Sequence, residues 1–273
     1  MSFSVLNNIP ALQAEANLST TQTSLQKTLQ QLSSGQRINN GADDAAGLAI
    51  ANGLQANIAA LNQSVQNANS GIGALQVADG AVSQVTGLLN RAITLATEAS
   101  TGTVSSSQRT ALDAEFQQIL AEVDRIGSKT TFNGTSVFTT TTTSVFLSDA
   151  GSNSTIGVSV GTLSSSGLGL SGKVLTGTDG SSAQTALTAI NTAVQTIATD
   201  RGTIGASINR LTDASAVITN QVQNLTSAED GILAADIPTV VSNLSRQSVL
   251  SQTGIAALAQ ANSQEASVLG LLH

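Results

Sequence analysis

One apolar pattern limits the fold more than any other feature of the chain. From Leu54 to Leu89 apolar residues recur at alternating spacings of four and three, with no proline in the segment. Such a heptad pattern is typical of long helices that pack along a shared seam. It predicts one helix over about residues 44–100, which at 1.5 Å per residue is about 80 Å long. The seam residues are Leu54, Ile58, Leu61, Val65, Ala68, Ile72, Leu75, Val82 and Leu89.

Two later segments repeat this spacing. One covers residues 112–126, and the other covers residues 187–225 with interruptions at Arg201 and Ser215. Aromatic residues make up only 2% of the chain, so most of its apolar content is Ala, Leu, Ile and Val. Small and branched side chains let helix axes approach closely. The sequence therefore predicts a mainly α protein: a long, antiparallel, coiled-coil-like bundle.

The middle of the chain has a different composition. Residues 130–178 are rich in Thr, Ser and Gly, and short β-branched runs near residues 145–147 and 156–160 predict strands. Asn133-Gly134 predicts a tight hairpin, because both residues tolerate positive φ. The run Thr139–Thr143 is interpreted as an exposed loop, in preference to a glycosylated or recognition loop. A small β element is thus expected among the helices.

Both chain ends predict amphipathic helices. Gly35 favours a helix end, and Asp43 or Asp44 favours the start of the next helix. Asp236 with Pro238 marks the start of the last helix, which leaves connectors at about residues 35–43 and 224–236. Two paired helices leave apolar area exposed, so self-association through these ends is expected. The candidate assembly residues are Leu12, Leu18, Leu25, Leu29, Leu32, Ile255, Leu258, Leu269 and Leu272.

Charge and residue types exclude several functions. The formal charge is −7 and only 10 residues are Lys or Arg, which argues against nucleic acid or membrane insertion. There is no Cys, and the one His is His273, so no catalytic constellation, metal site or cofactor site is expected. Adjacent Asp43 and Asp44 are explained by helix capping, and Gly71-Ile72-Gly73 lacks the third glycine of a nucleotide motif. With no signal-peptide pattern, composition alone suggests a cytoplasmic protein.

Several motifs resemble one known family. Residues 32–50 (LSSGQRINNGADDAAGLAI) closely resemble the amino-terminal signature of bacterial flagellins. Residues 243–246 (NLSR), 258–262 (LAQAN) and 268–272 (VLGLL) resemble the carboxy-terminal signature, and residues 121–134 are similar to the inner rod of the family. The large variable outer region is missing, so the chain looks like a minimal flagellin.

The resemblance implies properties that spacing does not show. It implies a non-enzymatic filament subunit, exported without signal cleavage to the extracellular flagellum, with an inner domain of residues 1–42 plus 232–273 and a rod domain of residues 43–231. It also implies a homo-oligomeric filament for motility, and an export chaperone, cap and junction proteins as partners. By the same resemblance, Arg91, Leu95 and Glu115 are candidate contacts for the vertebrate innate flagellin receptor; the alternative is a solvated Arg, a seam Leu and a surface Glu, or lateral subunit contacts.

Three other functions stay open at this point. A hook-filament junction protein shares related termini but does not propagate a filament. A secreted adhesin or glycoside-binding module would use the Thr- and Ser-rich centre. An intracellular coiled-coil scaffold would use the helices alone.

Overall fold

The computed structural model describes residues 8–148 and 154–270. It is mainly helical (74%), with two small antiparallel sheets. The chain divides into two compact units: residues 1–56 with 224–273 form the terminal unit, and residues 57–223 form the central unit. The predicted fold class is therefore confirmed.

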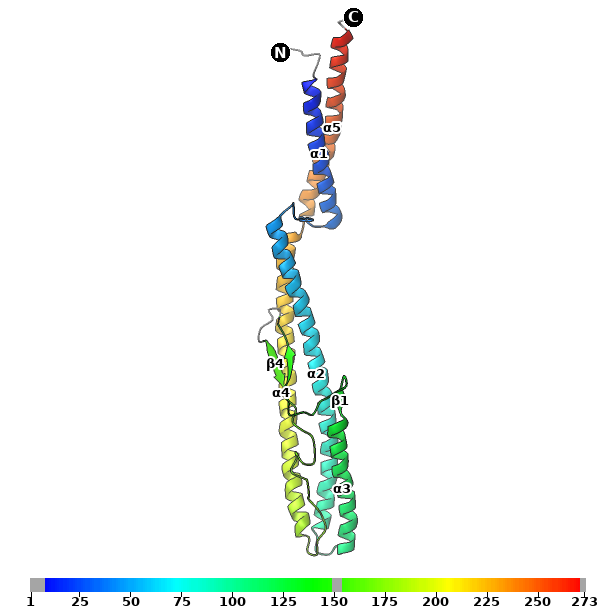
Figure 1. Cartoon of the computed structure of the whole chain (residues 1–273), viewed down its shortest axis with the longest axis vertical. Coiled ribbons are helices and arrows are strands. Elements are labelled where there is room, and N and C mark those ends of the chain that lie inside the picture. Colours follow the sequence, from blue (N-terminus) through cyan, green and yellow to red (C-terminus); the bar gives the residue numbers. More distant parts are fainter. Residues whose placement is uncertain (1–7, 149–153, 271–273) are drawn as a thin grey trace. The chain divides into compact units, whose positions relative to one another are not determined.

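In the terminal unit, α1 (Ile9–Ser34) pairs with α5 (Ile237–Gly270) (Figure 1). Cap residues mark both ends of α1. The side-chain oxygen of Asn8 accepts the N–H of Ala11, which satisfies one free donor at the start of α1. The helix ends at Gly35, whose φ of 69° is readily adopted only without a Cβ. The predicted pairing of the two chain ends is thus confirmed.

Two long helices run from the terminal unit into the central unit: α2 (Ala45–Ala99) and α4 (Ser181–Leu233). The Asp44 carboxylate accepts the N–H of Gly47 at 2.8 Å, so Asp44 caps α2, as one of the two predicted candidates. The prediction of a connector over residues 224–236 is wrong, because α4 continues to Leu233 and only three residues separate it from α5. No proline or cap stops the helix there, and a break in apolar spacing does not break backbone hydrogen bonds.

In the central unit α2, α3 (Ser106–Lys129) and α4 lie side by side (Figure 1). A capping box starts α3: Ser105 and Gln108 satisfy each other's backbone N–H groups. The three helices share a closed apolar core, whose most deeply buried residues are at most 1% exposed. Its members include Leu75, Leu89, Leu95, Phe116, Val123, Ile190 and Ile197.

The β element follows α3 as predicted. β1 (Thr131–Phe132) pairs with β2 (Thr135–Ser136) through Asn133 (φ 49°) and Gly134 (φ 77°), while β3 (Thr143–Phe146) pairs with β4 (Thr155–Val158). The chain then crosses α3 so closely that a Cβ at Gly127 would lie 1.6 Å from the Leu163 carbonyl oxygen. Only glycine fits there, which fixes the return segment against the helix.

Candidate assembly surface

The terminal unit buries very few side chains. Among its described residues, the buried apolar side chains are Ile38, Ala51 and Val240, all outside α1. Two paired helices can cover only the stripe that each turns toward the other. The α1–α5 pair therefore has no closed core of its own.

The predicted assembly residues fall into two groups. Leu12, Leu29 and Ile255 are exposed, with fractions of 59%, 48% and 55%. Leu18, Leu25, Leu32 and Leu258 are half-buried, and Leu18 lies against Gly254 of α5. The side chain of Leu269 and the whole of Leu272 lie outside the described residues.

The sequence analysis missed two exposed apolar residues of α5. Val249 and Leu250 of α5 are 58% and 49% exposed. Their signal in the sequence was an adjacent apolar pair beside the predicted stripe. We use the name outward face for these exposed apolar residues taken together: Leu12, Leu29, Val249, Leu250 and Ile255. At about 100° per residue they point to several sides of the two helices. Burying a large apolar side chain is worth about 1.5–3 kcal/mol, so this face can drive association with further helices.

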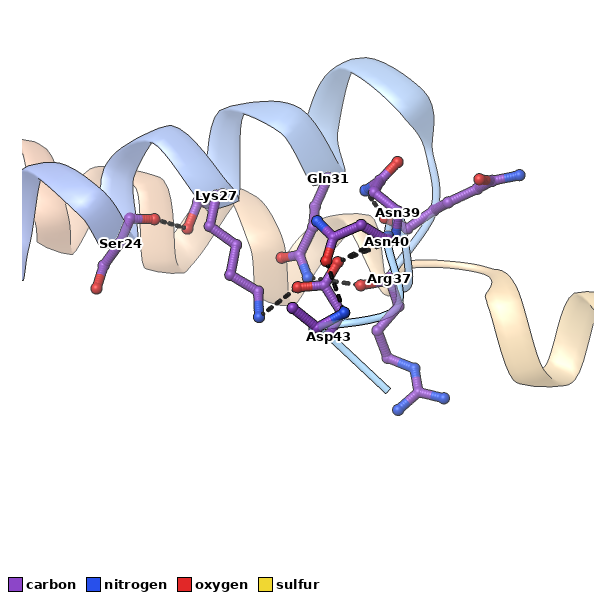
Figure 2. A network of polar contacts seen from close by, with 10 residues as sticks. Ser24, Lys27, Gln31, Arg37, Asn39, Asn40 and Asp43 are labelled. Carbon is purple, nitrogen blue, oxygen red and sulfur yellow. Dashed lines mark hydrogen bonds and ion pairs between the residues drawn. The ribbon is translucent and has the colours of Figure 1, made fainter. Parts of the chain in front are cut away.

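A polar network fixes the connector between α1 and α2 (Figure 2). Lys27 Nζ of α1 lies 2.8 Å from Asp43 Oδ1. Asp43 Oδ2 accepts the backbone N–H groups of Asn39 (3.0 Å) and Asn40 (3.2 Å). Gln31 of α1 also donates to the Arg37 carbonyl at 2.8 Å. The connector is therefore held to the last turns of α1, and Asp43 does not cap α2.

The same connector also forms hydrogen bonds with the end of α4. The backbone N–H of Arg37 donates to the Leu233 carbonyl, and its guanidinium donates to the Ile232 carbonyl at 2.8 Å. Residues Gln36 and Ala234 form an antiparallel β-bridge. A cation at a helix C-terminus satisfies carbonyls that have no partner within the helix. Arg37 thus links the connector after α1 to the last turn of α4.

Acid is expected to loosen this connector. The hydrogen bond from Lys27, followed by that from the Asn39 N–H, holds the pKa of Asp43 below its ordinary 3.8. A carboxyl with a lowered folded-state pKa stabilises the fold above its unfolded pKa, and that contribution is lost as pH falls through the lowered value. Amide NMR shifts of Asn39 and Asn40 should therefore titrate with a midpoint below pH 3.8, and Asp43→Asn should abolish the titration. A midpoint at or above 3.8 would contradict this assignment.

The three receptor candidates lie together in the central unit. Arg91 Nε of α2 and Glu115 Oε1 of α3 form an exposed ion pair at 2.7 Å, which lowers the pKa of Glu115. Leu95 is buried in the core, with 1% of its surface exposed. Of the three candidates, only Arg91 and Glu115 are therefore accessible to a partner.

The described residues contain neither a metal-binding cluster nor a glycine-rich phosphate loop at Gly71 and Gly73. Within residues 8–148 and 154–270 no group of three acidic or imidazole side chains is placed to hold a metal ion. Gly71 and Gly73 lie in the middle of α2, where no phosphate-binding loop exists. In the same part of the chain, no helix combines the length and apolarity required to span a bilayer.

Comparison with known proteins gives the family. Residues 5–143 match the bacterial flagellin N-terminal helical region, and residues 187–272 match the bacterial flagellin C-terminal helical region. The chain is 35% identical to a flagellin of Halalkalibacterium halodurans, with 98% of each chain covered. It is 33% identical to flagellin FlaB2 of Treponema pallidum, covering 98% of this chain and 99% of that one.

A longer relative shows what this chain lacks. A flagellin of Escherichia coli O127:H6 is 36% identical over 226 residues, which are 82% of this chain but 41% of that protein. The short chain thus has both helical regions without a large middle domain. It belongs to the bacterial flagellin family and is a non-enzymatic subunit of the extracellular flagellar filament, a homopolymer that serves motility.

Proposed function

We propose that copies of this flagellin polymerise through the outward face of α1 and α5. The observation that carries the proposal is the contrast between the units: almost all buried apolar side chains lie in the central unit, whereas the large apolar side chains of the terminal helices are mostly exposed or half-buried. Large exposed apolar areas mark interaction sites. Neighbouring copies in a helical array would cover the face at every subunit. Seeded filament growth by full-length variants with glutamate on this face tests the proposal.

The two chain regions take different roles in this proposal. Residues 1–42 with 232–273 form the inner domain of the filament, and residues 43–231 form the rod. Two features support the division: the poor burial along α1 and α5, and the closed helical core that includes Phe116 and Ile190. The half-buried Leu18, Leu25, Leu32 and Leu258 hold the pair together, while the outward face meets other copies. Leu269 and Leu272 are proposed to extend the same contact.

The proposed partners follow from the same exposed helices. An export chaperone would cover the apolar side of α5 before assembly, because Val249, Leu250 and Ile255 are open in the single chain. Cap and junction proteins would meet the same surface at the two ends of the filament. Growth of purified chain into long filaments on seeds separates a propagating subunit from a junction protein, which stops after a short layer.

The vertebrate innate flagellin receptor is a further proposed partner, contacted through the exposed Arg91–Glu115 pair with Leu95 as its buried support. An arginine at the centre of an interface often contributes about 2 kcal/mol or more, equal to roughly 30-fold in affinity. We expect Arg91→Ala monomer to need roughly 30-fold higher doses in a receptor reporter assay. Arg125→Ala, at the exposed ion pair of α3, is the matched control and should change little. A silent wild-type monomer would remove the receptor from the proposed partners.

A further inference from the structure

Asparagine is followed directly by glycine at three places in the chain: Asn40-Gly41, Asn52-Gly53 and Asn133-Gly134. This dipeptide is prone to spontaneous loss of ammonia, because the backbone nitrogen of a glycine can approach the side chain before it without hindrance from a Cβ. In the reaction this nitrogen attacks the carbon of the asparagine side-chain amide. The rate at each site therefore depends on the structure around the glycine nitrogen.

Regular structure protects two of the three sites. Gly53 lies inside α2, where each backbone N–H donates to the carbonyl four residues earlier. Asn133 and Gly134 form the two-residue turn between β1 and β2, with φ values of 49° and 77°. Ring closure requires the peptide after the asparagine to rotate, which breaks hydrogen bonds of the helix or of the hairpin. Both sites therefore react only after local unfolding.

The third site has an unpaired backbone N–H. Gly41 lies in the connector between α1 and α2, outside any helix or strand, and both Asn40 and Gly41 are exposed. Within residues 8–148 and 154–270, the Gly41 N–H has no hydrogen-bond acceptor. A Cβ built on Gly41 would meet no atom within 4 Å. The nitrogen can thus move toward the Asn40 side chain without breaking a helix or a strand pair.

The Asn40 side chain already turns back onto this part of the connector. Its Oδ1 accepts the N–H of Ala42 at 3.0 Å. A donor at this oxygen stabilises the negative charge that develops on it when the amide carbon is attacked. The bond can also persist after attack, because Oδ1 and the Ala42 N–H are then related as the acceptor and donor of a γ-turn. The local geometry therefore favours the reaction at Asn40.

We infer that Asn40-Gly41 is a spontaneous deamidation site, and that the folded connector directs the reaction to it in preference to the other two dipeptides. The Gly41 nitrogen loses its proton to hydroxide and forms a bond to Cγ of Asn40. The bond between Cγ and Nδ2 then breaks, and ammonia leaves. Water opens the resulting cyclic imide by adding to one of its two carbonyls, and the ring nitrogen takes up a proton. An aspartate or an isoaspartate replaces Asn40.

The modification weakens the polar network around Asp43. The Asn40 N–H donates to Asp43 Oδ2 at 3.2 Å, and the Asn40 carbonyl accepts the Asp43 N–H at 3.1 Å. An isoaspartate inserts a methylene group into the main chain, so these two bonds cannot both keep their geometry. Either product also adds a negative charge three residues before Asp43, whose carboxylate pairs with Lys27. Deamidation therefore loosens the attachment of the connector to α1.

Ageing of the full-length monomer at mildly alkaline pH tests the site. Peptide mapping by mass spectrometry measures the conversion of each asparagine, and hydroxylamine, which cleaves the imide, should cut the chain after Asn40. Asn40 should convert about tenfold faster than Asn52 and Asn133 or more, because those two sites wait for local unfolding. Equal rates at the three sites, or faster conversion at Asn52 or Asn133, would overturn the inference.

The unfolded chain shows how much of this preference comes from the structure. In concentrated urea the three asparagines should convert within about threefold of one another, because each is then the same dipeptide in a disordered chain. If Asn40 were faster by the same factor in urea as in the folded monomer, the sequence around it and not the connector would direct the reaction. That result would overturn the inference.

Two glycine substitutions form a matched pair. Gly41→Ala and Gly53→Ala each place a methyl group beside an attacking nitrogen. At either position a Cβ meets no atom within 4 Å and the glycine has no positive φ, so both variants should fold. Gly41→Ala should reduce ammonia release from the folded chain severalfold, whereas Gly53→Ala should leave it unchanged. Equal release from the two variants would contradict Asn40 as the site.

The effect on the connector has its own readout. In the aged monomer, the titration of Asp43 seen at the Asn39 amide should move to higher pH than in fresh monomer, because a backbone donor is lost and a negative charge is added. Gly41→Ala monomer kept under the same conditions should retain the original midpoint. An unchanged midpoint in the aged, deamidated wild-type chain would overturn the proposed loosening.

Discussion

Leu12→Glu, Leu29→Glu and Ile255→Glu chains are each expected to fold as monomers and to fail to elongate filament seeds. These side chains are about half exposed or more in the single chain, so a carboxylate there is solvated and costs the monomer little. In the filament the carboxylate would be buried without a partner, at a cost of several kcal/mol. Because each 1.4 kcal/mol is a factor of ten, the subunit affinity of a growing end should fall by roughly 100-fold or more. Electron microscopy of seeds after incubation measures the loss.

The controls separate assembly from folding. Gln30→Glu and Gln252→Glu are exposed polar positions on the same two helices and should reduce growth far less, because their side chains are not part of the outward face. The thermal melting of the central unit should be unchanged in all variants, since its core contains none of these residues. Leu25→Glu and Leu258→Glu should also prevent growth, but with weaker α1–α5 pairing in the monomer, since both are half-buried. Leu269→Glu is expected to prevent growth as well. Normal filaments from the Leu12 variant would refute the assembly surface.

Arg109→Met is expected to be the most damaging single substitution in the central unit. Arg109 is 2% exposed, and its guanidinium donates to four carbonyls: Ala99 (2.8 Å), Thr101 (3.1 Å), Gly177 (3.1 Å) and Thr178 (3.0 Å). Methionine fills most of the volume but satisfies none of them. Leaving buried acceptors unpaired should cost about 3 kcal/mol, or roughly 6–12 °C in Tm at this size.

Calorimetry or circular dichroism on the full chain measures this change. Arg125→Met is the matched control on the same helix, because its pair with Glu122 is exposed to solvent and contributes little to stability. Arg109→Lys should fall between the two, since one ammonium cannot reach carbonyls on both chain segments. Equal melting temperatures of the Arg109→Met and Arg125→Met variants would contradict the stabilising role of the four Arg109 hydrogen bonds.

The sequence predicted the helices well because their spacing is a direct record of burial. The nine predicted seam residues between Leu54 and Leu89 all lie in α2, where five are buried and four are half-buried. Asn133-Gly134 makes the expected turn. The end of α4 was missed because apolar spacing shows only which side of a helix is buried. When the buried side changes, the spacing breaks, but the backbone hydrogen bonds of the helix continue. Helix ends are therefore visible at Gly35, where a special φ is needed, and hidden where no such residue exists.

Side-chain roles were harder to predict than helices. Leu12 and Leu18 look equivalent in the sequence, yet one is exposed and the other packs on Gly254, because that choice depends on how α5 lies. Arg109 carries no sequence signal at all, since its four acceptors are backbone carbonyls, two of them in a segment almost 70 residues away. Asp43 was expected to cap a helix and instead holds Lys27, a contact that needs the connector's path.

The thin burial along α1 and α5 also affects when filaments appear. When two free chains associate, each covers only one side of the other's exposed apolar surface. Their dimer therefore gains little free energy and dissociates quickly. A chain that binds to the end of an existing filament contacts several subunits at once and buries more of its apolar surface. Lengthening is therefore much easier than starting, and a secreted pool of this protein should show a long lag that preformed ends remove.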